Sequence, residues 1–258
     1  MTSQRIIVGV DGSCGARSAV EWAVDECRLR RCSLLVSHTV DARDGNLVAG
    51  APDAQGYDGV AEQLLAGHAA AASARQPGVA VTTLLSRALP ADALIDLSQF
   101  AQMVVVGTRG RNGFTSTMLG SVSHRTAVHA HSPVAVIPQG PSRPPGEHSP
   151  GSVVVGVSGG RAARLALAFA RVEAHARGTD LRTVLADDDP AEALLRAAQG
   201  AQLLVVGCHH SEDRWSTRLG PVPTSILHRS PGPVVVVGDV GGSERTPDSR
   251  DDVAEAVG

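Results

Sequence analysis

MVVVGTRGRNGFTSTMLGSVS, residues 103–123, is the stretch that decides the fold class predicted for this chain. Its first part, 103–106, is a continuous apolar run rich in β-branched residues, which is typical of a strand buried on both faces in a parallel sheet. A glycine-rich loop follows, and Gly120 with Ser121 opens a helical pattern that runs toward His129. A strand, a glycine loop and a helix start in this order present backbone N–H groups to an anion. The stretch therefore predicts a phosphate-binding loop, although a glycine-rich connection without a ligand has the same pattern.

The residue types within this stretch suit a phosphate group. Gly107 and Gly110 allow the backbone to turn tightly, and Gly120 allows a phosphate to approach the helix start without a Cβ in the way. Ser121 and Ser123 add hydroxyl donors, and Ser121 is also expected to cap the helix.

The overall composition excludes several classes of protein. The chain has 258 residues, of which 43% are hydrophobic and 2% aromatic, and this suggests two α/β domains of modest size. A net charge of -3 and a pI near 6.3 give no electrostatic footprint for nucleic acid. No apolar run approaches the ~20 residues that a membrane span needs, and the N-terminus does not resemble a signal peptide. We therefore expect a cytoplasmic protein that binds neither nucleic acid nor membrane.

Lysine is absent from the sequence, because all 23 basic residues are arginine. This excludes a Walker A loop, a lysine Schiff base and a kinase-type phosphate lysine. A phosphate site in this chain must rely on backbone amides, hydroxyl groups and arginine.

The four cysteines, Cys14, Cys27, Cys32 and Cys208, form no CxxC pair. In a chain expected to be cytoplasmic, they are predicted to be reduced structural thiols.

The first half of the chain alternates between strand and helix patterns. Before the glycine stretch, strands are predicted at 5–10, 33–40 and 79–85. Helices are predicted from 14, with Ser13 as the cap, at 58–76, and at 91–100, with Pro90 in the first turn. A surface loop is predicted at 41–57, and a last strand at 133–137 follows the strand and helix of the glycine stretch. This alternation predicts a doubly wound parallel sheet.

The second half repeats the first with a deletion. Residues 155–157 repeat 8–10 at an offset of 147, whereas from residue 181 onward the offset is 100, so the second repeat lacks 47 residues. This deficit equals about one strand and one helix, and the second sheet should have about four strands. We predict one domain at 1–138, a Pro-rich linker at 139–151, a truncated domain at 152–238 and a disordered tail at 239–258.

The chain resembles a tandem universal stress protein. The resemblance rests on VGVDGS at 8–13, on the G-x2-G-x9-G-S spacing from Gly107 to Ser121, and on the endings VHAHSPVAVIP at 128–138 and LHRSPGPVVVVG at 227–238. It implies a Rossmann-like, adenine nucleotide hydrolase-like sheet of order 3-2-1-4-5, with ATP at the ends of strands 1 and 4. It also implies antiparallel pairing of the last strands, 134–137 and 234–237. A homodimer remains open.

The resemblance further implies the residues of a nucleotide site. Gly9 matches the approach of the first strand to the nucleotide, Asp11 matches an acidic contact to the nucleoside, and Thr39 matches backbone hydrogen bonds to adenine. The residues that match the ribose and phosphate cradle, or lie within its loop, are Gly107, Thr108, Arg109, Gly110, Arg111, Gly113, Gly120, Ser121, Val122 and Ser123. Any Mg²⁺ at this site is expected to be held by the phosphates. Arg109 and Arg111 have an equally good interpretation as solvated loop residues.

The corresponding site of the second half is degraded. Ser158 replaces Asp11, His210 replaces Gly110, and prolines 221 and 223 stand where the first half has Ser121 and Ser123. Since proline lacks an N–H group, we expect the second half to bind no ATP.

Other candidate sites and functions are weaker. The pair His209-His210 and the run at 187–189 resemble metal ligands, but no further ligands are spaced to complete a site. No pair of carboxylates or His beside a nucleophile is well placed, so no catalytic residue is assigned. The leading hypothesis is an ATP-binding stress-response regulator. A slow ATPase or nucleotidyl-transfer enzyme and a ligand-free interaction scaffold are the alternatives.

Overall fold

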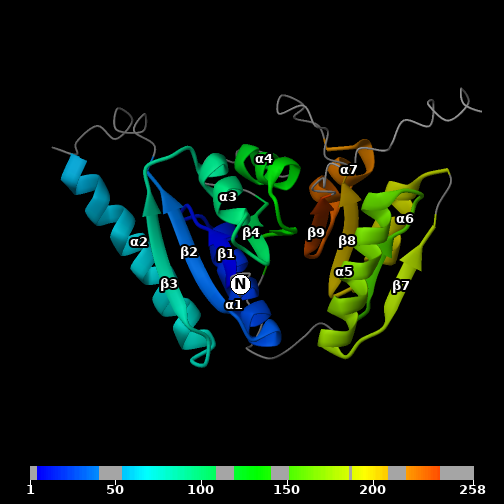
Figure 1. The fold of residues 1–258 in the computed structure, drawn as a ribbon, viewed down its shortest axis with the longest axis horizontal. Coiled ribbons are helices and arrows are strands. Elements are labelled where there is room, and N and C mark those ends of the chain that lie inside the picture. Colours follow the sequence, from blue (N-terminus) through cyan, green and yellow to red (C-terminus); the bar gives the residue numbers. More distant parts are fainter. Residues whose placement is uncertain are drawn as a thin grey trace, which may run out of the picture.

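The computed structural model describes residues 5–40, 54–108, 119–140, 151–185, 188–208 and 219–238. Its two halves lie side by side and share one nine-stranded sheet of order β3-β2-β1-β4-β5-β9-β8-β6-β7 (Figure 1). The strands are β1 (Arg5–Gly9), β2 (Ser33–Thr39), β3 (Val81–Ser86), β4 (Met103–Gly107), β5 (Val134–Ile137), β6 (Val153–Gly156), β7 (Leu181–Val184), β8 (Leu203–Cys208) and β9 (Val234–Gly238). The sheet order predicted for the first half, 3-2-1-4-5, is confirmed.

Helices cover both faces of the sheet. They are α1 (Cys14–Arg30), α2 (Ala54–Arg75), α3 (Pro90–Ser98), α4 (Ser121–His129), α5 (Arg161–Arg177), α6 (Pro190–Ala197) and α7 (Pro221–Arg229). One core cluster joins the sheet to α1, α2 and α5, and the other joins it to α3, α4, α6 and α7. The described residues therefore form three layers, with the sheet in the middle.

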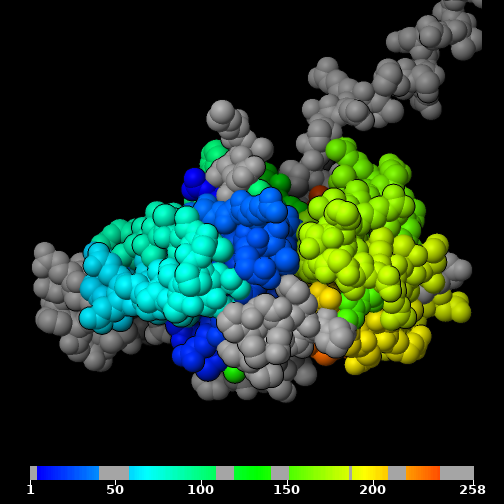
Figure 2. All heavy atoms as spheres, turned by 90° about the horizontal axis from the view of Figure 1, so that it is seen from below, coloured from blue at the N-terminus to red at the C-terminus, as the bar shows by residue number. Residues whose placement is uncertain are grey.

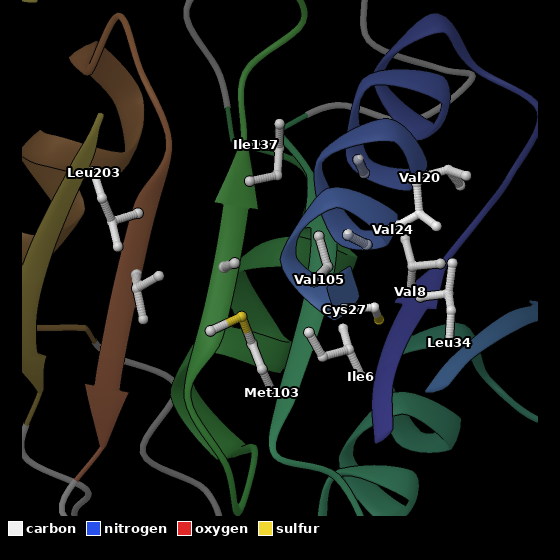
Figure 3. Close-up of a cluster of buried hydrophobic side chains, with 14 of the residues drawn as sticks. Ile6, Val8, Val20, Val24, Cys27, Leu34, Met103, Val105, Ile137 and Leu203 are labelled. Atoms are coloured by element: carbon white, nitrogen blue, oxygen red, sulfur yellow. The ribbon is translucent and has the colours of Figure 1, made fainter. Parts of the chain in front are cut away.

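Side-chain alternation along the strands divides the core between these two faces. Ile6 and Val8 lie in the cluster under α1, whereas Ile7 between them lies in the opposite cluster. In β4, Met103 and Val105 alternate with their neighbours in the same way, and Figure 3 shows both beside Ile6 and Cys27. The continuous apolar runs of the sequence follow from this burial on two faces.

The two halves meet where their last strands pair. β5 and β9 run antiparallel, with Val134 opposite Val236 and Val136 opposite Val234. In Figure 3 the green strand ending at Ile137 points up and the brown strand beside it points down. The parallel ladders within each half thus join through one antiparallel pair.

A buried cluster of four charges also joins the halves. Arg30 on α1 binds Glu26 at 2.6 Å and also binds Glu173 on α5, while Arg177 on α5 binds Glu26 at 2.5 Å and also binds Glu173. The pair Glu173–Arg177 repeats Glu26–Arg30 at the offset of 147, so the cluster follows the internal repeat. Figure 2 shows the blue surface of α1 in contact with the lime surface of α5.

The missing 47 residues change the second half in one place. β7 aligns in sequence with β3, but it pairs directly with β6, just as β2 pairs with β1 in the first half. The predicted four strands are present, and β7, the single strand between β6 and β8 in the chain, takes the place of the absent neighbour of β6.

Several boundaries differ from the sequence predictions. α2 begins at Ala54, so the predicted surface loop 41–57 extended too far. Ala54 and Gln55 favour a helix, and one glycine costs only about 1 kcal/mol, so Gly56 does not stop it. The third strand begins at Val81 rather than at 79. The tail 239–258 and most of the linker lie outside the described residues.

Candidate functional site

The carboxyl ends of β1, β2 and β4 lie at one edge of the first half, the upper edge in Figure 1. β1 is hydrogen-bonded to both β2 and β4, so the three strand ends are direct neighbours. α4 begins at this same edge, after the connection from β4. The chain reverses its direction of winding between β1 and β4, and open α/β sheets bind ligands at such a switch point.

The end of β1 is shaped by hydrogen bonds from its own loop. Asp11 Oδ1 accepts from the Ser13 N–H at 3.0 Å, and Ser13 Oγ accepts from the Ala16 N–H at 3.1 Å. Ser13 is therefore the N-cap of α1, as predicted. Gly12 between them has a φ of +79°, which a residue with a side chain rarely adopts. These bonds hold the half-buried Asp11 carboxylate in a fixed turn.

β2 extends past the end of β1. The last β1–β2 pair is Gly9 with Ser37, and the Ser37 carbonyl accepts from the Val10 N–H at 2.9 Å. Because backbone groups alternate sides along a strand, those of Thr39 point to the same side as those of Ser37, beyond the last paired residue of β1. His38 Nδ1 lies 2.7 Å from the Val10 carbonyl and supports this end of the sheet.

Three hydrogen bonds close the base of the β4–α4 connection. Thr108 donates its N–H to the Ile137 carbonyl at 2.9 Å and accepts from the Gly120 N–H at 2.9 Å. The buried Ser123 donates its hydroxyl to the Gly107 carbonyl at 2.6 Å. The two ends of the glycine loop are thus held together, and the Ser123 hydroxyl makes one of the hydrogen bonds that hold them.

The first turn of α4 follows this connection in the chain. Gly120 is the N-cap, with no side-chain hydrogen bond to the helix, and Ser121 is the first helical residue. The expectation that Ser121 caps the helix is therefore wrong, since the Gly120 carbonyl already accepts the first helical bond, from His124 at 2.9 Å. The N–H groups of the first turn, including those of Ser121, Val122 and Ser123, have no partner within the helix.

Two glycines of the site also have a packing role. A Cβ on Gly9 would lie 2.8 Å from Leu94 Cδ1 of α3, and one on Gly107 would lie 2.9 Å from the Gly15 backbone of α1. The second half repeats both close approaches, at glycines 156 and 207, with distances of 2.9 and 2.7 Å. These glycines therefore allow helices to pack closely against the strands in both halves, and they do not by themselves indicate a ligand.

Four predicted site residues, Arg109, Gly110, Arg111 and Gly113, lie outside the described residues. The same holds for His209, His210 and Asp187. Among the residues that are described, no three His, Cys, Asp or Glu side chains gather as a metal site.

Two histidines near this edge could not be found from the sequence motifs. His68 lies on α2, one turn after Leu64, which covers Gly12. Burial lowers the pKa of His68, and the positive charge of Arg17 lowers it further, while Asp11 opposes the change. The charge of Asp11 at the predicted site therefore acts on a residue of α2.

The second histidine comes from the other half of the chain. His228 Nδ1, on α7, accepts from the Leu119 N–H at 3.4 Å, next to Gly120. Burial lowers the pKa of His124 on α4, and His228 contributes to that lowering. The start of α4 is therefore in contact with the second half, a relation between distant segments that no local motif could reveal.

The equivalent edge of the second half offers fewer donors. Pro221 is the first residue of α7 and Pro223 lies in its first turn. Neither supplies an N–H group. α5 has Gly160 at its N-cap, with no side-chain bond in the place of Ser13.

Comparison with known proteins identifies the family. The sequence model of the universal stress protein family matches residues 2–138 and 157–238, so the chain belongs to this family. The universal stress protein Rv1996 of Mycobacterium tuberculosis is 30% identical over 312 aligned positions, covering 91% of this chain and 95% of the relative. That alignment has 54 more positions than this chain has residues, so the relative carries segments that this chain lacks.

A solved structure shares the fold of this chain. A universal stress protein from Archaeoglobus fulgidus has a TM-score of 0.70 at 17% identity, covering 92% of this chain and 99% of that chain. Another from the same organism was solved in complex with dAMP, with a TM-score of 0.40 and 23% identity, covering 53% of this chain and 98% of that chain. In the part of this chain that the structure describes, no helix is long and apolar enough to cross a membrane.

Proposed function

We propose that this universal stress protein binds one ATP at the edge of its first half, where β1, β2 and β4 end and α4 begins. The bound state is proposed to regulate a stress response through the contact between the two halves. The observation that carries the proposal is the start of α4, which has no side-chain cap and is tied to the end of β4 by the bonds from Gly120 to Thr108 and from Ser123 to Gly107.

The phosphates would lie at the first turn of α4. The N–H groups of Ser121, Val122 and Ser123 have no partner within the helix, and the helix dipole favours negative charge there. No acidic residue occupies this first turn to compete with a phosphate. Ser123 would act mainly through its backbone, since its hydroxyl holds the Gly107 carbonyl.

The nucleoside would lie over the ends of β1 and β2. The carboxylate of Asp11 is fixed by the Ser13 N–H and is suited to accept hydrogen bonds from the hydroxyl groups of a ribose. The backbone of Thr39, directed beyond the end of β1, is suited to hydrogen bonds with adenine. Arg109 and Arg111 are proposed to neutralise the phosphates with Gly110 and Gly113 shaping their loop, and this part rests on sequence alone.

Mg²⁺ is proposed to accompany the phosphates rather than to have a protein site of its own. The described residues bring no three metal-ligating side chains together. Phosphate oxygens supply the hard oxygen ligands that Mg²⁺ prefers.

The link to regulation is proposed to run through His228. This residue of α7 accepts a hydrogen bond from Leu119, one residue before the N-cap of α4. A ligand that draws the start of α4 toward its phosphates would change this contact, so the second half can register whether the site is occupied.

Calorimetry with a matched pair of variants tests the site. Gly120→Glu places a negative charge where the phosphates are proposed to lie, and the loss of charge-assisted bonds worth about 1.5–3 kcal/mol should weaken ATP binding at least ~10-fold. Gly220→Glu makes the same change in the second half, where a Cβ meets only Pro223 Cδ at 3.7 Å, and should leave the affinity unchanged. Equal ATP affinity in wild type and Gly120→Glu would overturn the assignment.

A further inference from the structure

The end of α1 brings two cysteines together. Arg31 follows the helix in the left-handed conformation, with φ 52° and ψ 48°. The Cys32 N–H donates to the Cys27 carbonyl at 3.0 Å, and the Arg31 N–H donates to the Arg28 carbonyl at 3.4 Å. These two bonds define a Schellman motif, in which the side chains at the positions of Cys27 and Cys32 are frequently in contact. In this chain the two thiols are within hydrogen-bonding reach of each other.

The environment differentiates the two thiols. The hydrogen bond from Cys27 lowers the pKa of Cys32, and the positive charge of Arg30 lowers it further against the effect of burial. The pKa of Cys27 is raised by the same hydrogen bond and by burial. Cys32 remains 8% exposed, whereas Cys27, on the buried face of α1, is 0% exposed (Figure 3). Cys32 is thus the more acidic thiol and the one nearer solvent.

The internal repeat shows that the backbone motif does not require cysteine. At the end of α5, the Thr179 N–H donates to the Ala174 carbonyl at 3.0 Å, and Gly178 adopts the left-handed conformation. Ala174 and Thr179 stand at the positions of Cys27 and Cys32, at the offset of 147. The same turn is therefore built with two residues that have no thiol, so the backbone of this turn does not require the cysteine pair.

We propose that Cys27 and Cys32 form a reversible oxidation site that reacts with hydroperoxides to give an intramolecular disulfide. The Cys32 thiolate attacks one oxygen of the peroxide and becomes a sulfenic acid, while the other oxygen leaves as water or an alcohol after taking up a proton. The Cys27 sulfur then attacks the Cys32 sulfur, and the sulfenic hydroxyl leaves as water with the proton of the Cys27 thiol. The two sulfurs together lose two electrons to the peroxide, and an external dithiol reverses the reaction.

The disulfide would sit beside the contact between the two halves. Arg30, whose charge acts on Cys32, also belongs to the buried cluster with Glu26 and Glu173. Oxidation therefore alters the immediate surroundings of a guanidinium that joins α1 to α5.

Peptide mapping of the full chain tests the proposal directly. The Cys14→Ser/Cys208→Ser variant is treated with hydrogen peroxide, its remaining thiols are alkylated in denaturant, and it is digested with trypsin. Trypsin cleaves after Arg28, so a Cys27–Cys32 disulfide joins two peptides that are otherwise separate. We expect this linked peptide, two hydrogens lighter than the sum of its parts, and we expect dithiothreitol to abolish it.

Two variants that copy the second half are the controls. Cys27→Ala and Cys32→Thr reproduce the residues at 174 and 179, so the fold should tolerate them, and neither should give a linked peptide. In Cys27→Ala, Cys32 should instead be oxidised to acids that dithiothreitol does not fully reverse. The proposal is overturned if Cys27 and Cys32 of the oxidised Cys14→Ser/Cys208→Ser chain are alkylated as completely as without peroxide, or if both are over-oxidised without a linked peptide.

Discussion

Replacing Arg177 by Met should destabilise the folded chain by about 3–5 kcal/mol. The Arg177 side chain is 4% exposed and contacts two carboxylates, Glu26 and Glu173, which are 2% and 1% exposed. Without its charge, these two buried carboxylates share a single guanidinium, that of Arg30, and one negative charge is left uncompensated. Methionine keeps much of the side-chain volume, so the predicted loss is mainly electrostatic.

Urea unfolding at pH 8 is the assay, because burial, together with the Glu26 charge, raises the pKa of Glu173 to about 7. The control is Arg125→Met, which removes the ion pair between Arg125 and Asp92. Because these side chains are 48% and 38% exposed, this change should lower the free energy of unfolding by at most about 1 kcal/mol. Equal unfolding midpoints for the two variants would refute the reasoning.

A fourfold replacement separates the unpaired charge from lost packing. Glu26→Leu, Arg30→Met, Glu173→Leu and Arg177→Met together remove the whole cluster and leave no buried charge. Such exchanges are often neutral or stabilising, so this variant should be more stable than Arg177→Met alone. A fourfold variant less stable than the single one would show that packing, rather than charge, dominates.

Three further predictions follow from single residues. Arg31→Gly should raise stability by about 1 kcal/mol, because glycine adopts the left-handed conformation without strain. Gly178→Ala should lower stability by a similar amount for the same reason. Thermal unfolding of both variants and the wild type tests this. Ser123→Ala removes the bond to the Gly107 carbonyl and should cost about 1 kcal/mol in urea unfolding and also weaken ATP binding in calorimetry. The raised pKa of Glu173 means that its contribution to stability is complete below pH 4.5 and is lost as the pH rises through about 7, so Glu173→Gln should flatten the pH–stability curve in that interval.

Much of the fold could be predicted because its signals are local or repeated. Apolar runs such as 103–106 mark strands buried on both faces, and the Ser13 N-cap is encoded by its own residue type. The change of offset from 147 to 100 located the missing strand and helix, and β7 pairs with β6 accordingly. The ion-pair cluster also had a sequence signal, since Glu173 and Arg177 repeat Glu26 and Arg30, but only the fold brings the two pairs together.

The remaining features depend on contacts between distant segments. The sequence indicated that Gly9 and Gly107 contact a ligand. In the structure, a Cβ at these positions would lie too close to Leu94 and to the backbone of Gly15. His228 reaches Leu119 across the contact between the halves, and nothing near either residue in the sequence indicates this. Gly120 rather than Ser121 caps α4, because the cap is decided by where the backbone turns and both residues are compatible with it.

The stoichiometry of ATP binding tests the central claim most directly. Saturating calorimetric titration of the full chain should give one ATP per chain, bound in the first half, because prolines 221 and 223 remove donors from the second. A value near two would contradict the proposed difference between the halves. The absence of any measurable binding would contradict the assignment of the first half as a nucleotide site.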